Sequence, residues 1–101
     1  MEAEIRRAAK VDSNHGKIVQ AFRELGCSVL DLSAVGCGCP DILVGSRLHG
    51  TFLAEIKDGQ LAPSRKALNP LQVAFHENWR GKVFVVESVQ DVIKCLTSLK
   101  G

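Results

Sequence analysis

The sequence lacks several features that would assign a protein to a class at once. No apolar run approaches the roughly 18 residues needed to cross a bilayer, and the N-terminal stretch MEAEIRR carries acids instead of the apolar segment of a secretion signal. There is no internal repeat, low-complexity tract or interdomain linker, and no GxGxxG or GxxxxGK phosphate-binding pattern. These absences predict a cytoplasmic protein with no membrane association.

Cysteine is present four times but without the spacing of a metal site. Cys27, Cys37, Cys39 and Cys95 contain no CxxC pair, and the three histidines do not complete a zinc pattern. In a reducing compartment such residues stay as free thiols. We therefore expect neither disulfides nor a structural zinc ion.

The charge balance does not by itself indicate a nucleic-acid-binding protein, because the net charge is only +2. The basic residues are nevertheless unevenly distributed, and phosphate contacts require local positive groups, not a high total charge. Ordinary solvated charges are an equally good interpretation for any one of them. The candidates for DNA contact are Arg6, Arg7, Lys10, Arg65 and Lys66.

Length and hydrophobic content predict one compact domain. A chain of 101 residues with 46% hydrophobic residues has room for a single core. We assign residues 1–101 to this domain and residues 1–11 to an N-terminal arm. Because a core of this size is marginal, a homodimer would supply additional buried surface.

Periodicity predicts a mixed α/β sheet of four strands flanked by helices. Apolar residues recur at helical spacing in the first helix, which Gly26 ends and which Asp12 or Ser13 can cap. Asn69 and Pro70 begin a second helix, and Ser88 caps the last. The expected helices cover residues 14–25, 70–79 and 89 onward; the strands cover 27–32, 41–46, 51–57 and 82–87; residues 59–69 form a loop.

The hairpin formed by the second and third strands places three charged residues together. A turn centred between residues 48 and 49 would put Asp41 opposite Ile56, with Glu55 and Lys57 beside it. A shift of the turn by half a residue would put Asp41 across from Glu55 or Lys57 instead. Glu55 and Lys57 share one face of their strand because side chains alternate. In each register the three polar groups can converge.

Two carboxylates held this close favour a bound cation. Like charges across a sheet are unfavourable, whereas Mg²⁺ accepts one or two carboxylates and keeps sites for water and phosphate oxygens. Asp41, Glu55 and the carbonyl of Ile56 are the candidate ligands, and Lys57 could orient a metal-bound water. The alternative is a surface ion pair in which Lys57 bridges the two acids.

These residues also carry a resemblance to a known family. Pro40-Asp41, thirteen intervening residues and Glu55-Ile56-Lys57 resemble the PD-(D/E)xK nuclease signature. Leu68 to Gln72, followed by Trp79 to Val83, is similar to the VRR-NUC branch, which occurs in phage proteins and repair nucleases. The resemblance covers roughly residues 12–96. It implies a restriction-endonuclease-like fold and a DNA endonuclease that depends on Mg²⁺ or Mn²⁺.

The resemblance also implies residue roles. Asp41 and Glu55 would be metal ligands, Lys57 the catalytic lysine, and Gln72 a polar helper near the phosphate or water. Gln72 could instead close a capping box with Asn69.

One departure from the family concerns the first helix. Family members often carry a glutamate there, where this chain has His15 with Asn14 beside it. Asn14 could offer an oxygen to a metal-bound water and His15 could contact phosphate, or both could simply begin the helix. The number of metal ions is therefore open.

The leading functional hypothesis is a structure-selective endonuclease, similar to a Holliday-junction resolvase, that acts as a homodimer on branched DNA in a bacterial or phage-infected cell. The chain has no recognisable sequence-reading motif, and dimer symmetry would address two strands at once. A flap or nonspecific nuclease is the second hypothesis. An inactive DNA-binding or assembly module is the third.

Overall fold

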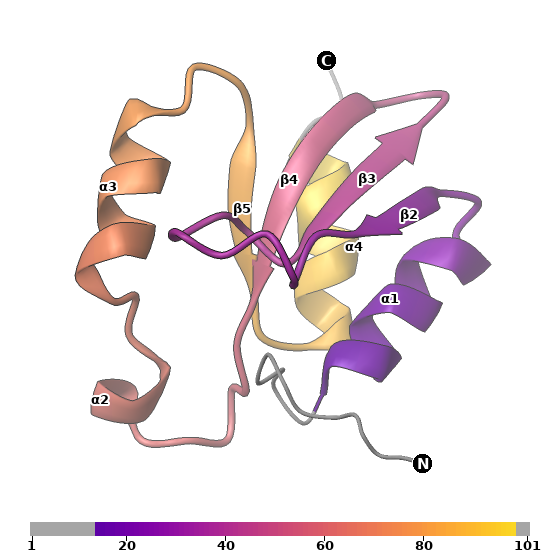
Figure 1. The fold of residues 1–101 in the computed structure, drawn as a ribbon. Helices are drawn as coiled ribbons and strands as arrows, with labels where there is room; N and C mark the ends of the chain where they lie inside the picture. The colour runs from indigo at the N-terminus through magenta and orange to yellow at the C-terminus, as the bar shows by residue number, and fades with distance from the viewer. Residues whose placement is uncertain (1–13, 99–101) are drawn as a thin grey trace, which may run out of the picture.

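The computed structural model describes residues 14–98, apart from the side chains of residues 65 and 66. The helices are α1 (His15–Glu24), α2 (Pro63–Lys66), α3 (Pro70–Asn78) and α4 (Val89–Ser98), and the strands are β2 (Ser28–Asp31), β3 (Ile42–Ser46), β4 (Gly50–Ile56) and β5 (Val83–Val86). The expected order of elements is present (Figure 1). Within the described range, no helix is long and apolar enough to cross a membrane.

The segment 59–69 was predicted to be a loop, and that prediction is wrong in one place. It contains the single turn of α2, which begins at Pro63 in the first helical position. The fixed φ of proline suits that position, and its missing N–H is not needed there. So short a turn gives no periodic apolar pattern from which it could be predicted.

The four strands form one mixed sheet in the order β2-β3-β4-β5. The β2–β3 and β3–β4 pairs are antiparallel, and the β4–β5 pair is parallel. The central position of β4 is evident from its five consecutive buried residues, 52–56. This is the mixed four-stranded sheet expected from the sequence.

The hairpin register is shifted from the centred turn. Ser46 pairs with Gly50 and Ile42 with Ala54, so the turn is centred on Leu48. The turn closes with Gly50 at φ 79°, a conformation that glycine adopts readily. Asp41 therefore does not lie opposite Ile56. Continuing the ladder by one residue places it level with Glu55, one of the two shifted alternatives.

The main hydrophobic core lies on one face of the sheet. Phe22 of α1 is fully buried against Phe52 of β4, with ring centroids 5.9 Å apart. Val92 of α4 is fully buried in the same cluster, and α1 and α4 lie together against the sheet (Figure 1). Because side chains alternate along β4, residues 52, 54 and 56 face this core while 53 and 55 face the other side. That other side carries the candidate site.

Helix α1 ends in a glycine motif that turns the chain into the sheet. Gly26 has φ 90°, its N–H donates to the carbonyl of Arg23, and the N–H of Cys27 donates to the carbonyl of Phe22 at 3.0 Å. These bonds form a Schellman motif, which satisfies carbonyls at the end of the helix. The stop predicted at Gly26 is present.

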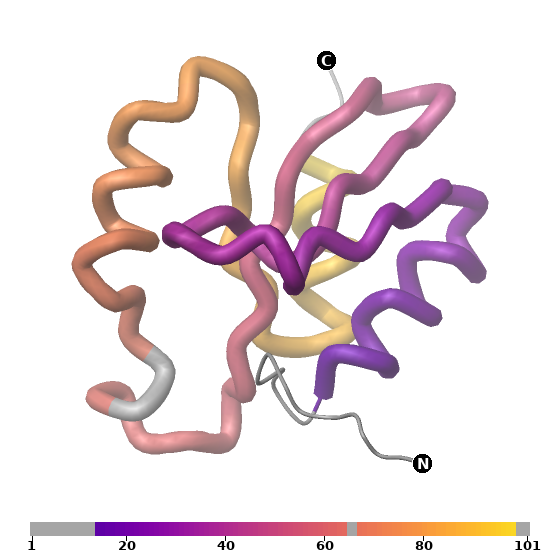
Figure 2. Tube along the Cα trace, viewed as in Figure 1, coloured from indigo at the N-terminus to yellow at the C-terminus, as the bar shows by residue number. Residues whose placement is uncertain are grey.

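The glycine-rich loop between β2 and β3 packs against the start of α3. It passes in front of the sheet towards that helix (Figures 1 and 2). A Cβ atom added to Gly38 would lie 2.4 Å from the carbonyl oxygen of Leu71 and 3.0 Å from the amide nitrogen of Gln72. Only glycine permits this backbone approach. The loop therefore sets the position of α3 over the open face of the sheet.

Candidate active site

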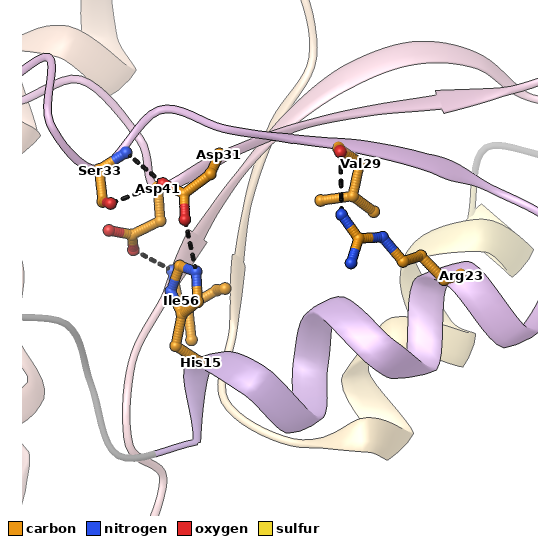
Figure 3. A network of polar contacts seen from close by, with 7 residues as sticks. All are labelled: His15, Arg23, Val29, Asp31, Ser33, Asp41 and Ile56. Atoms are coloured by element: carbon orange, nitrogen blue, oxygen red, sulfur yellow. Dashed lines mark hydrogen bonds and ion pairs between the residues drawn. The ribbon is translucent and has the colours of Figure 1, made fainter.

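Asp41 is fixed in place by both its backbone and its side chain. Its carbonyl accepts the N–H of Leu32 at 2.7 Å. Its Oδ2 accepts the N–H of Ile56, also at 2.7 Å (Figure 3). The antiparallel ladder ends at the Ile42–Ala54 pair, so the carboxylate takes over the strand N–H just beyond it. Asp41 therefore lies at the end of β4, beside Glu55.

Glu55 and Lys57 are connected through one amide on α3. The Nε2 of Gln72 donates to the Oε2 of Glu55 at 3.0 Å, and the Nζ of Lys57 donates to the Oε1 of Gln72, also at 3.0 Å. The amide presents its NH₂ group to the carboxylate and its oxygen to the ammonium group. If the amide were flipped, its NH₂ group would face the ammonium group and its oxygen would face the carboxylate, so neither hydrogen bond could form. Glu55 is only 2% exposed, whereas Gln72 and Lys57 are half-buried, so the network runs from the buried carboxylate towards solvent.

Gln72 also caps its own helix, so both interpretations of this residue are present together. Its backbone N–H donates to the Oδ1 of Asn69 at 2.9 Å, and its Oε1 accepts the N–H of Asn69 at 3.0 Å. This is a complete capping box. The oxygen of Gln72 therefore accepts from both Asn69 and Lys57, which uses its two lone pairs. The start of α3 and the charged cluster consequently share one side chain.

Two further titratable residues lie near this cluster, and the sequence motif did not indicate them as site residues. Burial raises the pKa of the Cys39 thiol, and the negative charges of Glu55 and Asp41 raise it further. Burial lowers the pKa of the His76 imidazole, and the positive charge of Lys57 lowers it further. Spacing offered one clue, since His76 lies one helical turn after Gln72.

Asn14 at the start of α1 acts as a clamp between two strands. Its Nδ2 donates to the carbonyls of Lys57 and Glu87, each at 2.9 Å. The amide nitrogen thus joins the two segments that directly follow β4 and β5. The side-chain Oδ1 has no hydrogen-bond partner among the described residues, so the expectation that Asn14 offers an oxygen to a metal-bound water stays a prediction. Asn14 is the helix N-cap residue but makes no side-chain cap bond.

His15 pairs with an acid on the edge strand. Its Nε2 lies 3.4 Å from the Oδ2 of Asp31, and its side chain is 13% exposed (Figure 3). The pKa of Asp31 is lowered chiefly by hydrogen bonds from the side chain and backbone of Ser33, with a smaller contribution from His15. His15 therefore has a protein partner on β2, and a phosphate contact by this residue stays a prediction.

Other predicted residues fall outside what the structure describes. Arg6, Arg7 and Lys10, as well as the proposed cap residues Asp12 and Ser13, precede residue 14, and the side chains of Arg65 and Lys66 are not described. All four cysteines are free thiols. Across residues 14–98 no group of three or more His, Cys, Asp or Glu side chains is arranged to hold a metal ion.

The arrangement can support metal-assisted hydrolysis with two carboxylates. Asp41 and Glu55 supply hard oxygen donors, and the carbonyl of Ile56 directly follows Glu55 in the chain. Mg²⁺ is suited to such a sparse set because it keeps several waters and binds through one or two carboxylates. The donor chemistry therefore fits a divalent cation of this type.

Comparison with known proteins identifies the family of this chain. No family model matches the sequence, and no curated protein matches it. A solved structure described as a VRR_NUC domain superposes with a TM-score of 0.62 and 31% sequence identity, over 83% of this chain and 95% of that chain. The mixed sheet and flanking helices are those of a restriction-endonuclease-like α/β fold. The chain belongs to the VRR-NUC family of PD-(D/E)xK-type nuclease domains.

Proposed function

We propose that this protein is a divalent-metal-dependent DNA endonuclease that acts on branched DNA. The observation that carries the proposal is the hydrogen-bonded chain Glu55–Gln72–Lys57 beside Asp41. It gathers two carboxylates, an ammonium group and an orienting amide at one end of β4.

Each side chain would have a defined task. Asp41 binds Ile56 through Oδ2, so its Oδ1 can serve as a metal ligand together with Glu55. A bound Mg²⁺ or Mn²⁺ supplies Lewis acidity towards a phosphate oxygen and lowers the pKa of a coordinated water. Lys57, held by Gln72, orients that water or neutralises charge that develops on the phosphate. Gln72 keeps the ammonium group and the Glu55 carboxylate at a fixed separation.

The preference for branched DNA and the homodimer form one proposal. The chain shows no sequence-reading motif, so selectivity would come from the shape of the substrate. Two copies related by a twofold axis would present two active sites to two strands of one junction. Paired, symmetric nicks in a four-way junction are the expected product.

A panel of DNA substrates tests the proposal. Wild-type protein should cut a four-way junction with Mg²⁺ or Mn²⁺ and not with EDTA. Asp41→Ala and Lys57→Ala should each lower the cleavage rate by at least roughly 100-fold, the scale seen when a transition-state contact is removed. DNA binding should persist. Glu24→Gln, at the exposed far end of α1, is the matched control and should cut normally.

The alternatives give different products on the same panel. Preferential cutting of a flap or of linear duplex would replace the branched-DNA proposal with the flap or nonspecific nuclease. Wild-type protein that binds DNA but cuts no substrate with either metal would establish the inactive binding module. Melting curves of each variant by circular dichroism separate loss of catalysis from loss of fold.

A further inference from the structure

The groove beside α3 contains an aromatic pair that the core does not use. It has a volume of about 290 Å³, and no carboxylate side chain is among the residues that line it. Phe75 and Trp79 stack within it, with ring centroids 5.3 Å apart and an interplanar angle of 16°. The lining residues are Cys37, Leu71, Ala74, Phe75, Asn78 and Trp79.

This pair is unusual for a chain with so few aromatic residues. The sequence has four phenylalanines, one tryptophan and no tyrosine. Phe22, Phe52 and Phe84 belong to the core or pack against it. Phe75 lies instead on α3, a helix with no buried residue, and Trp79 is the C-cap residue of that helix and is 46% exposed. We call this pair the aromatic ledge.

Around α3, Trp79 lies near the side that carries the active-site amide of Gln72, and Phe75 lies about 60° from it by ideal helix geometry. Trp79 follows Gln72 by seven residues, and its N–H still donates to the carbonyl of Phe75 at 2.9 Å. At 3.6 residues per turn and 1.5 Å per residue, the two Cα atoms are offset by about 20° around the axis and about 10 Å along it. That distance is roughly three base steps of a DNA strand.

The charges around the aromatic ledge suit a polyanion. Arg80 follows Trp79 directly and Lys82 lies three residues after it, and both are exposed. The one acid on α3, Glu77, lies about 160° around the helix from Trp79 by the same geometry. A base can stack on an aromatic ring in a sequence-tolerant way, because every base has a π-face.

We propose that the aromatic ledge binds an unpaired nucleobase of the DNA substrate by stacking, a few nucleotides from the bond that is cut. The inference rests on the proposed function and makes it more specific, since paired bases within a duplex cannot reach such a surface. It requires an unpaired base at the branch point of the substrate, next to the bond that is cut. Gly81 leaves room for the indole in this position, because a Cβ there would approach Trp79 Nε1 to 2.8 Å.

Trp79 is the only tryptophan in the sequence, so its fluorescence reports on the aromatic ledge alone. The experiment titrates wild-type protein in EDTA with a splayed duplex that has single-stranded arms, and with a blunt duplex of equal length. We expect quenching by the splayed DNA and little change with the blunt duplex. Because no cleavage is needed, the result does not depend on catalysis.

Substitutions test whether stacking contributes to affinity. Trp79→Ala and Trp79→Leu should each weaken binding of labelled splayed DNA by roughly 5- to 150-fold, the equivalent of one base stack. Binding of the blunt duplex should be unchanged. Leu48→Ala is the matched control, since Leu48 is an 89% exposed apolar residue on the distant hairpin turn. The leucine variant keeps apolar bulk at position 79 and removes only the ring.

The remaining outcomes distinguish failure of the inference from failure of the proposed function. Equal losses on splayed and blunt DNA, or a leucine variant that binds like wild type, would show that no base stacks at Trp79. A fluorescence change that tracks protein concentration without DNA, with dimers that Trp79→Ala abolishes, would show that a second copy occupies the aromatic ledge. Cleavage without quenching refutes the aromatic ledge alone, and quenching without cleavage refutes the proposed function alone. Failure to bind any DNA refutes both.

Discussion

Replacing Gly38 with alanine should separate the effect of backbone conformation from the effect of close packing. Gly38 has φ 82°, and an added Cβ would lie 2.4 Å from a backbone oxygen of Leu71. Gly36 has a similar φ of 78°, but a Cβ there would meet nothing within 4 Å. The two glycines thus share one backbone cost and differ in one steric cost, and Gly36→Ala is the matched control.

The expected magnitudes follow from these two contributions. A left-handed conformation costs a residue with a Cβ about 1–2 kcal/mol, partly offset by about 0.4–1 kcal/mol because alanine restricts the unfolded chain. Gly36→Ala should therefore lower the free energy of unfolding by no more than about 1–2 kcal/mol. Overpacking typically costs a further 1–3 kcal/mol. Gly38→Ala should therefore lower the free energy of unfolding by about 1–3 kcal/mol more than Gly36→Ala does.

Urea denaturation followed by circular dichroism measures the difference, provided the m-values agree. In thermal unfolding, each 1 kcal/mol corresponds to roughly 4–8 °C for a domain of 60–100 residues. Gly38→Ala should also lower cleavage more than Gly36→Ala, because relief of the clash moves α3 and with it Gln72. Equal unfolding midpoints for the two variants would refute the claim that the loop positions this helix by direct backbone contact.

Two other predictions follow from the same region. Asn69→Ala and Gln72→Ala should each lower the free energy of unfolding by about 0.5–2 kcal/mol, because both break the capping box. Only Gln72→Ala also removes the bridge between Glu55 and Lys57, so only this variant should lower the cleavage rate. Equal cleavage rates in the two variants would contradict the bridging role. The lowered pKa of His76 means that the unfolded chain binds more protons just below pH 6.5. Stability should therefore fall as the pH drops from about 6.5 towards the folded-state pKa, and His76→Gln should flatten this part of a pH series of urea midpoints; an unchanged slope would assign the effect elsewhere.

The sequence predicts this fold well wherever the signal is local. The apolar residues Ile18, Ala21 and Phe22 recur at helical spacing, and Gly26 ends that helix as a helix stop should. The four strands follow from β-branched runs between turn residues. The active-site motif is likewise local, since two neighbouring strands in a hairpin must place Asp41 near Glu55 in any reasonable register.

What could not be predicted depends on contacts between distant parts of the chain. The bonds of Asn14 reach residues 57 and 87, which lie 43 and 73 positions away. No propensity or periodicity contains that information. The same holds for Cys39, whose nearness to both carboxylates arises from the path of a glycine-rich loop, and for Gly38, whose role is evident only once α3 is in place.

The two faces of the sheet are held by different kinds of contact, which explains why the sequence predicts the site only in part. The face that packs on α1 and α4 is held by apolar burial, which a periodic pattern encodes. The opposite face is held by a few directional contacts: the backbone approach at Gly38 and the bonds that join Gln72 to Glu55 and Lys57. Because α3 buries none of its own residues, its position over the carboxylates depends on those contacts. A change in any one of them should therefore alter the geometry of the site before it unfolds the core.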